Sequence, residues 1–343
     1  MDVYKIAIAG ASSLLGRELK DVLADSPLAA CEIVLFDEEE TRGQLEQVGD
    51  EVAVIQSIGV DAFDRVDFTF FCGSEALTRH HWQQAVRSGS TVLDLTGALD
   101  QETGVLVRAS WLGAETSAVD LFTPAVVPAH PAAVALVLLL RRVQQAAPIR
   151  FAAATVLAPS SEFGRAAMDE LHRQTVNLLN FQSLPRAIYD AQAAFNLLCG
   201  MGEEARASLS TLEDRIRRHY EALTGGCGSS LAVQIVHAPV FHGLTFSIAI
   251  ELDHPVENAS LEEALAGERV ELVLEDTDSP SNLAITGQDE VHVRLRTEPL
   301  GRNTNQAQRL WLWAAADNLR LNAQNAVQCA LDLRRLRPQG TVQ

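Results

Sequence analysis

The chain has 343 residues, with 27 basic and 45 acidic side chains and a formal charge of −18. Affinity for nucleic acid comes mainly from lysine and arginine side chains that neutralise phosphates, so this balance argues against a nucleic-acid-binding protein. Hydrophobic residues make up 47% of the chain and the mean hydropathy is +0.05, which excludes intrinsic disorder and suggests about two folded domains.

The first 128 residues show alternating strand and helix patterns. An apolar strand, Lys5–Ala9, leads into a glycine-containing turn and a helical pattern over Arg17–Ala24. A later amphipathic helix ends at Arg87, and further strands are predicted at Glu32–Phe36, Asp67–Cys72 and Thr91–Leu95. This alternation predicts an α/β fold, a Rossmann-type doubly wound sheet that binds a dinucleotide, over residues 1–128.

Residues 129–307 are predicted to form a separate α+β domain. Helices are expected at Pro131–Gln145, Arg165–Leu179 and Glu203–Thr224. Strands are expected at Arg150–Leu157, Leu231–Val236, Thr245–Leu252 and Glu290–Arg296. Residues 308–343 are interpreted as a C-terminal segment, whose long amphipathic helix Gln308–Leu336 is expected to pack back on the first domain.

The cysteines and the apolar runs indicate a soluble, cytoplasmic protein. No cysteine pair has the C-x-x-C spacing of a zinc or redox site, so all five are expected to be reduced thiols: Cys31, Cys72, Cys199, Cys227 and Cys329. The most apolar run, Ala132–Leu140, is far shorter than the roughly 20 residues that span a bilayer. The start of the chain runs directly into a strand, which leaves no room for a signal peptide.

The turn after the first strand reads Gly10-x-x-Ser13-x-x-Gly16 and resembles a dinucleotide-binding loop. Ser13 takes the place of the middle glycine, where its side chain would crowd a phosphate or donate a hydrogen bond to it. Asp37 ends the second strand, where an acid commonly accepts from a ribose hydroxyl, and three glutamates follow it. The four carboxylates favour NAD over NADP. A plain turn and a solvated strand end remain the alternative interpretations.

Beyond these motifs, the chain resembles the aspartate-semialdehyde dehydrogenase family, and within it the degenerate Usg-type paralogues, from Ile6 to Asn325. The resemblance lies in these strings: Ala9-Gly-Ala-Ser-Ser-Leu-Leu-Gly16, Phe71-Cys-Gly-Ser74, Met168-Asp-Glu-Leu-His172, Ala194-Phe-Asn196, Pro239-Val-Phe-His-Gly243, Val291-His-Val-Arg-Leu-Arg296, Asp317-Asn-Leu-Arg320 and Asn325-Ala-Val-Gln328. The family implies a Rossmann domain completed by the C-terminal helix, and a central domain that forms a homodimer.

The resemblance also implies a cofactor site. The family's enzymes use NADPH, and the matching positions here are Gly10, Ser12, Ser13, Leu14, Gly16, Asp37, Gly73, Ser74 and Asn325. Because Ser13 narrows the loop, we expect any binding of NAD or NADP to be weak. Because the acidic run disfavours a 2′-phosphate, we expect NAD to be preferred.

The family's catalytic groups are a cysteine that carries the acyl group and a histidine base. The nucleophile position falls at His130, in Pro128-Ala-His-Pro131, and the base position falls at Leu244. Three further positions have lost the family's residues. A phosphate-binding arginine is replaced by Asp100, an acyl-positioning glutamine by Leu157 and a carboxylate-binding arginine by His237. We therefore expect no catalytic residues and a non-catalytic or repurposed dimeric protein.

Other interpretations remain open. The chain could be an active NAD(P)-dependent dehydrogenase of amino-acid biosynthesis, with Cys72 as its nucleophile, or a regulatory subunit that forms a heterodimer with an active paralogue. A zinc site is a further hypothesis, with His130, His237 and His242 as its ligands. The alternative interpretation is that these histidines are polar residues that line a pocket. For a homodimer, the alternating apolar residues Val233, Ile235, Phe246 and Ile248 are expected to remain exposed and form the interface.

Overall fold

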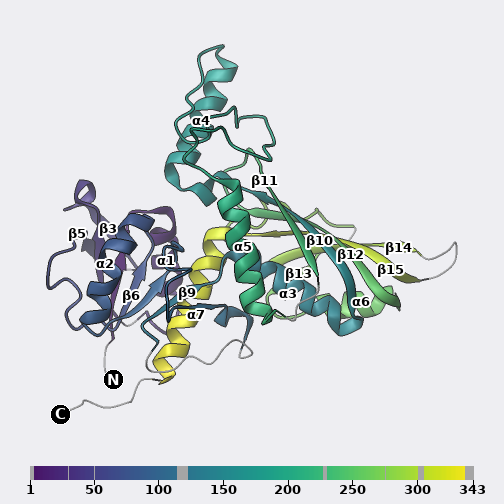
Figure 1. The fold of residues 1–343 in the computed structure, drawn as a ribbon, viewed down its shortest axis with the longest axis horizontal. Helices are drawn as coiled ribbons and strands as arrows, with labels where there is room; N and C mark the ends of the chain where they lie inside the picture. Colours follow the sequence, from purple (N-terminus) through teal and green to yellow (C-terminus); the bar gives the residue numbers. More distant parts are fainter. Residues whose placement is uncertain are drawn as a thin grey trace. The chain divides into compact units, whose positions relative to one another are not determined.

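The computed structural model describes residues 4–29, 31–49, 51–113, 123–226, 230–274, 276–299 and 305–336. The chain divides into two compact units, one formed by Met1–Ala129 with Asn322–Gln343 and the other by His130–Leu321. Each unit contains its own large sheet (Figure 1). In the described part of the chain, no helix is long and apolar enough to cross a membrane.

The first unit is built on a seven-stranded parallel sheet of order β5-β2-β1-β6-β7-β9-β8. Its strands are β1 (Lys5–Ala9), β2 (Glu32–Asp37), β5 (Gln56–Ser57), β6 (Phe68–Phe71), β7 (Thr91–Asp94), β8 (Leu106–Arg108) and β9 (Ala125–Pro128). Its helices are α1 (Leu14–Ala24) and α2 (Glu75–Arg87), with 3-10 turns η1 (Glu39–Thr41) and η2 (Ser110–Leu112). A small hairpin, β3 (Leu45–Val48) and β4 (Glu51–Val54), stands apart from this sheet.

Alternate residues of β1 enter two different cores, which is the signature of a sheet covered on both faces. Ile6 and Ile8 pack in one cluster with Leu19 and Leu23 of α1 and with the C-terminal part of helix α7 (Asn318–Leu336). Ala7 and Ala9 pack in the other cluster, with side chains of α2. This arrangement confirms the predicted doubly wound sheet. In the sheet, β1 lies between β2 and β6, so the strand order reverses at β1. Folds of this kind bind ligands at such a switch point.

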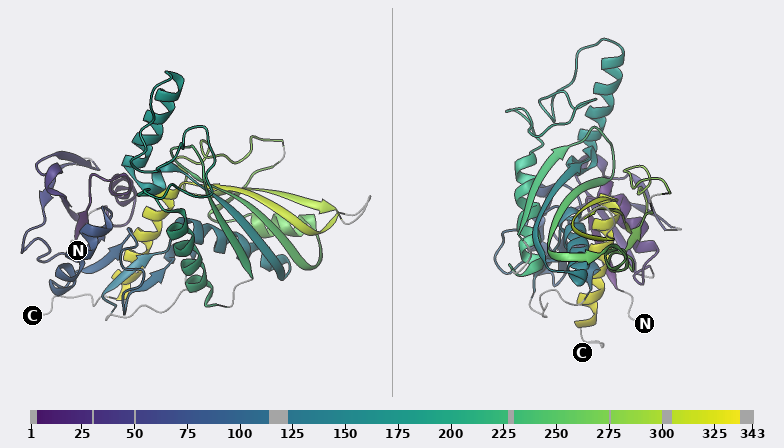
Figure 2. Two further views of the ribbon diagram at one scale, coloured as in Figure 1. Left: turned by 45° about the horizontal axis from the view of Figure 1, so that its top comes forward. Right: turned by 90° about the vertical axis from the view of Figure 1, so that its right-hand side faces the viewer.

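The second unit is built on a six-stranded mixed sheet of order β11-β10-β12-β15-β14-β13, in which the central pairs are antiparallel and the pair at each edge is parallel. Figure 2 shows the fold from two further directions. Its strands are β10 (Ile149–Ala158), β11 (Leu231–His237), β12 (Leu244–Glu257), β13 (Val270–Leu272), β14 (Val291–Pro299) and β15 (Gln306–Ala316). Its helical elements are α3 (Pro131–Ala146), η3 (Ser160–Phe163), α4 (Arg165–Leu179), α5 (Leu209–Thr224) and α6 (Asn258–Leu265). The unit is the α+β domain that the sequence predicts.

One prediction about this sheet is wrong. Ile235, Phe246 and Ile248 are not exposed; their side chains are at most 2% accessible and form the core under α3, α5 and α6. The three helices bury the face that the alternating pattern seemed to leave open. The opposite face of the sheet is not covered by these three helices, and there Trp311 and Trp313 of β15 are 39% and 38% exposed.

The predicted final helix is also wrong in its first part. Residues Gln306–Ala316 form strand β15, and helix α7 begins only at Asn318. The string Arg309-Leu-Trp-Leu-Trp313 explains the difference, because its leucines are buried and its tryptophans exposed, with the period of two that belongs to a strand. The helix expected from Glu203 likewise begins later, at Leu209, after the Ser208 N-cap.

Candidate functional site

In the first unit, the turn after β1 requires glycine at both ends. Gly10 has a φ of 92°, and a Cβ atom there would lie 2.1 Å from the Gly73 amide nitrogen. A Cβ atom on Gly16 would lie 2.3 Å from the Gly10 carbonyl oxygen. The loops after β1 and β6 therefore touch, and α1 starts directly against the turn. These are two of the reasons for which dinucleotide-binding loops contain glycine.

Ser13 has a local role that the sequence did not reveal. Its hydroxyl oxygen accepts from the Gly16 amide at 2.9 Å, as the N-cap of α1, and its proton is donated to the Cys72 carbonyl at 2.8 Å. Both hydrogen-bonding roles of the hydroxyl are therefore already used within the protein. The amides of Leu14 and Leu15, the first two residues of α1, have no carbonyl partner within the helix, so they are the donors that an anion would meet.

Two carboxylates at the end of β2, Asp37 and Glu38, have different surroundings. Asp37 is only 8% exposed, and its two oxygens accept from the amides of Ser12 at 2.7 Å and Glu38 at 2.8 Å. Glu38 is exposed, and its Oε1 accepts from the Ser74 hydroxyl at 3.0 Å. Ser74 also caps α2 by accepting from the Leu77 amide. The contact predicted between Asp37 and a ribose stays a prediction.

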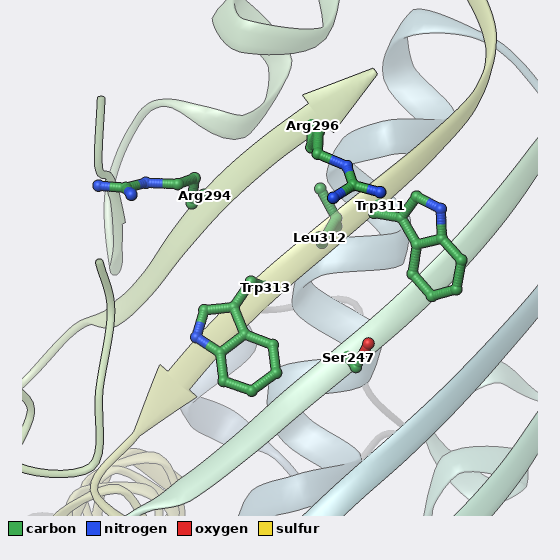
Figure 3. A pocket seen from close by; sticks show the side chains of 6 residues that line it. All are labelled: Ser247, Arg294, Arg296, Trp311, Leu312 and Trp313. Carbon is green, nitrogen blue, oxygen red and sulfur yellow. The ribbon is translucent and has the colours of Figure 1, made fainter. Parts of the chain in front are cut away.

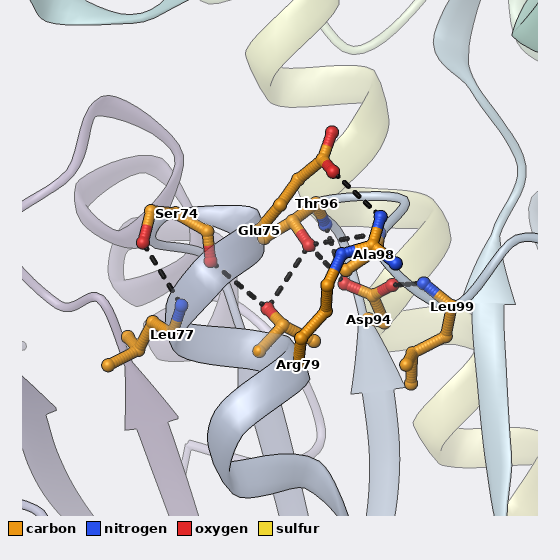
Figure 4. A network of polar contacts seen from close by, with 9 residues as sticks. Ser74, Glu75, Leu77, Arg79, Asp94, Thr96, Ala98 and Leu99 are labelled. Carbon is orange, nitrogen blue, oxygen red and sulfur yellow. Dashed lines mark hydrogen bonds and ion pairs between the residues drawn. The ribbon is translucent and has the colours of Figure 1, made fainter.

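The loop after β7 is folded back by one buried aspartate (Figure 4). Asp94 accepts from the amide and hydroxyl of Thr96, at 2.9 and 2.6 Å, and from the Leu99 amide at 2.8 Å. Thr96 is linked in turn to Thr78 of α2 at 3.1 Å. The turn ends at Asp100, where the family resemblance places a cation. A carboxylate in that place repels an anion rather than binding it.

Asn325 of α7 is fully buried, and its amide group is engaged with the backbone of the same unit. Its Oδ1 accepts from the Trp111 amide at 3.2 Å, and its Nδ2 donates to the Arg108 carbonyl at 3.1 Å. The predicted cofactor contact of Asn325 also stays a prediction. Cys72 is 4% exposed, and burial, reinforced by the negative charges of Asp94 and Asp37, raises the pKa of its thiol. It therefore lacks the thiolate character of a nucleophile.

The second unit contains His130, where the resemblance places the family's nucleophile. His130 is 2% exposed and is the N-cap of α3, where its Nδ1 accepts from the Ala132 amide at 3.1 Å. Its Nε2 lies 2.5 Å from Oε1 of Glu162. Because Nδ1 is an acceptor, Nε2 must hold the proton and donate it to the carboxylate. Both ring nitrogens are thus engaged, and His130 has no free lone pair for a substrate or a metal.

Glu162, in η3, is the central residue of this site. Its Oε2 accepts from Nδ2 of Asn318 at 3.3 Å, and Asn318 Oδ1 accepts from the Gly243 amide at 3.3 Å. Burial alone would raise the pKa of Glu162, but the His130 imidazole, the Arg215 guanidinium and the Asn318 amide together hold it below its usual range. The site therefore contains an ionised, buried carboxylate beside the nucleophile position.

The remaining positions are distributed around the ends of β10, β11 and β12. Leu244 is fully buried and pairs with Ala316 of β15, so it is a core residue without a titratable atom. Leu157 alternates with the buried Val156 and Ala158 and shares the outer face of β10 with Thr155. The network of Glu162 and Asn318 thus connects His130 to the strand start at Leu244, whereas Leu157 lies on the other face of the sheet.

His237, at the end of β11, is fully buried and neutral. Its Nδ1 donates to the Ala158 carbonyl at 3.2 Å, and its ring stacks on Tyr189 with centroids 4.9 Å apart. Burial lowers the pKa of His237 to about 4, although the bond to Ala158 opposes this shift. A neutral imidazole cannot replace the charge of an arginine that binds a carboxylate.

Among the described residues, no group of three histidine, cysteine, aspartate or glutamate side chains is placed to hold a metal ion. The described cysteines are all free thiols: Cys31, Cys72, Cys199 and Cys329; Cys227 lies outside the described residues. Sequence reasoning missed Glu162. The available signal was an acidic residue within the otherwise small and apolar stretch Pro159–Gly164.

Known proteins match both units of the chain. Residues 5–148 match the family model "Semialdehyde dehydrogenase, NAD binding domain", and residues 140–321 match "Semialdehyde dehydrogenase, dimerisation domain". A USG-1 protein homolog from Pseudomonas aeruginosa is 31% identical over 330 residues, covering 93% of this chain and 94% of its own. A USG-1 protein homolog from Azotobacter vinelandii is 29% identical over 328 residues, covering 95% and 96%.

A solved structure gives the same result for the fold. It is described as a probable aspartate-semialdehyde dehydrogenase from Pseudomonas aeruginosa, superposes with a TM-score of 0.83 at 27% identity, and covers 97% of this chain and 99% of its own. The two family models, the nearly full-length relatives and this superposition agree with the glycine turn and the two-unit fold. The chain therefore belongs to the aspartate-semialdehyde dehydrogenase family.

Proposed function

We propose that this protein is a non-catalytic or repurposed member of its family that keeps the dinucleotide-binding loop and assembles as a homodimer. The observation that supports this proposal most is that both ring nitrogens of His130 already form hydrogen bonds within the protein. The family's chemistry needs a thiolate at this position, whereas here an imidazole caps α3 with one nitrogen and binds Glu162 with the other. Neither nitrogen is available to attack a carbonyl carbon.

The other necessary steps also lack their groups. Leu244 cannot move a proton, and Asp100 and the neutral His237 cannot hold phosphate and carboxylate by charge. Loss of a nucleophile or a base alone commonly costs several orders of magnitude in rate, and the remaining groups do not rescue it. A regulatory role in a heterodimer with an active paralogue is compatible with the same features.

Catalysis is tested with purified protein, aspartate semialdehyde and phosphate, by following NADH or NADPH absorbance with each cofactor. We expect no turnover above a protein-free blank, while an active aspartate-semialdehyde dehydrogenase in the same assay gives a clear signal. The double variant His130→Cys, Leu244→His should also remain inactive, because substrate and phosphate are still not held. Turnover by the unmodified protein that disappears in Cys72→Ser would overturn the proposal and identify an active dehydrogenase.

Weak dinucleotide binding is proposed for the first unit. The glycines allow the loops after β1 and β6 to approach, and the Leu14 and Leu15 amides are directed as at other helix N-termini that bind phosphates. Ser13 contributes to the turn but offers no donor to the ligand. The carboxylates after β2 favour NAD over NADP, because a 2′-phosphate would meet negative charge.

A homodimer is proposed through the face of the six-stranded sheet that α3, α5 and α6 do not cover. Trp311 and Trp313 border an open pocket of about 340 Å³ on this face, together with Arg296 (Figure 3). In the neighbouring strand β12, Ala249 pairs with Trp311 and Ser247 pairs with Trp313. Beyond them, in β10, are Ala153 and Thr155. The aromatic part of the face is therefore followed, across β12 and β10, by a patch of small side chains.

This division suits a second copy of the chain. In a two-fold interface the same patch meets itself, so the tryptophans of one protomer would lie over the small residues of the other. Aromatic side chains and arginine are the residues most enriched at such interfaces. The proposed interface thus uses the face opposite to the one that the sequence suggested.

A further inference from the structure

Two adjacent carboxylates at the end of β2 have different availability. Both oxygens of Asp37 already accept backbone amides, from Ser12 and Glu38, and the side chain is 8% exposed. Its hydrogen bond from the Ser12 amide connects the turn after β1 to the end of β2. Glu38 is exposed, and within the described part of the chain its carboxylate accepts one hydrogen bond, from the Ser74 hydroxyl.

The bond between Glu38 and Ser74 passes over the glycine turn. In the sheet, β1 lies between β2 and β6, so a bond from the loop after β2 to the residue that caps α2 after β6 crosses the carboxyl end of β1. Gly10, at that end, touches Gly73 from the same loop as Ser74. In open α/β sheets a dinucleotide binds in the crevice at this switch point.

We propose that Glu38, rather than Asp37, faces the adenine ribose and sets the preference for NAD over NADP. The inference rests on the proposed dinucleotide binding and names the residue that determines its specificity. On binding, the ribose 2′-hydroxyl donates to the Glu38 carboxylate and replaces the Ser74 hydroxyl as its partner. A 2′-phosphate in the same place brings like charges together, which disfavours NADP.

The cation nearest in sequence does not offset this repulsion. The Nη1 atom of Arg42 lies 2.9 Å from Oε1 of Glu39, so its charge is paired within η1 and its C-cap. Glu39 is therefore a matched control, because it is an exposed carboxylate next to Glu38 with a partner of its own. Asp37 provides the second control, because its carboxylate has a structural role.

The experiment measures the dissociation constants of NADH and NADPH by fluorescence titration, for the unmodified protein and for Glu38→Gln, Glu39→Gln and Asp37→Asn. In Glu38→Gln we expect the ratio of the NADPH constant to the NADH constant to fall about tenfold, because the amide keeps the Ser74 contact and removes the charge. Glu39→Gln should leave the ratio within twofold. Asp37→Asn should lower the melting temperature and leave the ratio unchanged.

The outcomes separate the two proposals. If the unmodified protein binds neither NADH nor NADPH, both the dinucleotide site and the role of Glu38 are overturned. If it binds them and the ratio does not move in Glu38→Gln, or moves equally in Glu39→Gln, the role of Glu38 alone is overturned. A fall of the ratio in Asp37→Asn, with Glu38→Gln unchanged, would assign the ribose to Asp37 instead.

Discussion

At the scale of single residues, His130 and Glu162 form a compensating pair. An imidazole at the start of α3 would leave a buried donor without an acceptor, and a carboxylate in η3 would be a buried charge without a donor. Together they satisfy each other at 2.5 Å, and Asn318 binds the second oxygen of Glu162. A hydrogen bond to a charged group typically contributes about 1.5–3 kcal/mol. The contacts around His130 and Glu162 thus stabilise this part of the fold.

This pairing predicts that restoring the cysteine alone gives an unreactive thiol. In His130→Cys the ionised Glu162 loses its donor and faces the new sulfur, which disfavours a thiolate. We expect the thiol pKa to lie at least about one unit above the ordinary 8.5. In His130→Cys, Glu162→Gln it should fall to that value or below, because the helix N-terminus then acts without an opposing charge.

The measurement is the pH dependence of iodoacetamide alkylation of the peptide that contains residue 130, followed by mass spectrometry. The midpoint of the rate profile gives the thiol pKa in each variant. Cys199, an exposed thiol in the same protein, serves as the internal reference. Equal midpoints in the single and double variants would show that Glu162 does not act on this position.

The candidate site positions were visible in the sequence, but their partners in the fold were not. The family resemblance locates His130 and Leu244 by alignment alone. Glu162 lies 32 positions from His130, and only the placement of η3 near the start of α3 makes it a partner. A pairwise contact between distant segments has no periodicity, so no pattern along the chain predicts it.

At the scale of elements, the turn between β1 and α1 depends on Ser13 for its own stability. The hydroxyl satisfies the Gly16 amide and the Cys72 carbonyl at once. Ser13→Ala removes both bonds, and loss of an N-cap alone costs about 1 kcal/mol. We expect a lower free energy of unfolding by roughly that amount or more, measured by urea denaturation.

Nucleotide affinity gives the second readout of the same variant. Because the hydroxyl is directed into the protein, Ser13→Ala should change the NADH dissociation constant less than twofold. Ser13→Gly, which recreates a middle glycine, should not strengthen binding either. A clear gain in affinity with Ser13→Gly would mean that the serine does obstruct the phosphate, as its place in the motif suggests.

Elements with one clear period were predictable, and ambiguous ones were not. The parallel strands are short apolar runs separated by turns, and their order along the chain led directly to the doubly wound sheet. Strand β15 was mistaken for helix because it runs almost without a break into α7, so that one long apolar segment contains two periods. Propensity could not separate them, since leucine and alanine favour helices whereas the alternation of Leu310, Trp311, Leu312 and Trp313 is that of a strand.

At the scale of the whole molecule, the division of the sheet into two faces determines how copies can associate. The inner face is closed by α3, α5 and α6, and its side chains are buried within one chain. The outer face exposes two tryptophans next to a row of small residues, an arrangement costly to leave in water. With aromatic anchors of this kind, an obligate dimer would bury more than about 2,000 Å².

The dimer is tested at both parts of this face by sedimentation velocity at micromolar concentration. We expect a dimer for the unmodified protein, and a shift towards monomer for Trp313→Glu in the aromatic part and Ala153→Arg in the patch of small side chains. Loss of a central tryptophan should cost about 2 kcal/mol or more, roughly thirtyfold in the dissociation constant. Phe181→Glu is the control, because this side chain is 97% exposed and follows α4 rather than belonging to a strand of the sheet. It should remain dimeric.

A monomer peak for the unmodified protein, or dimers in both sheet-face variants, would rule out this interface. The two parts must respond together, because under two-fold symmetry each tryptophan rests on the small residues of the other protomer.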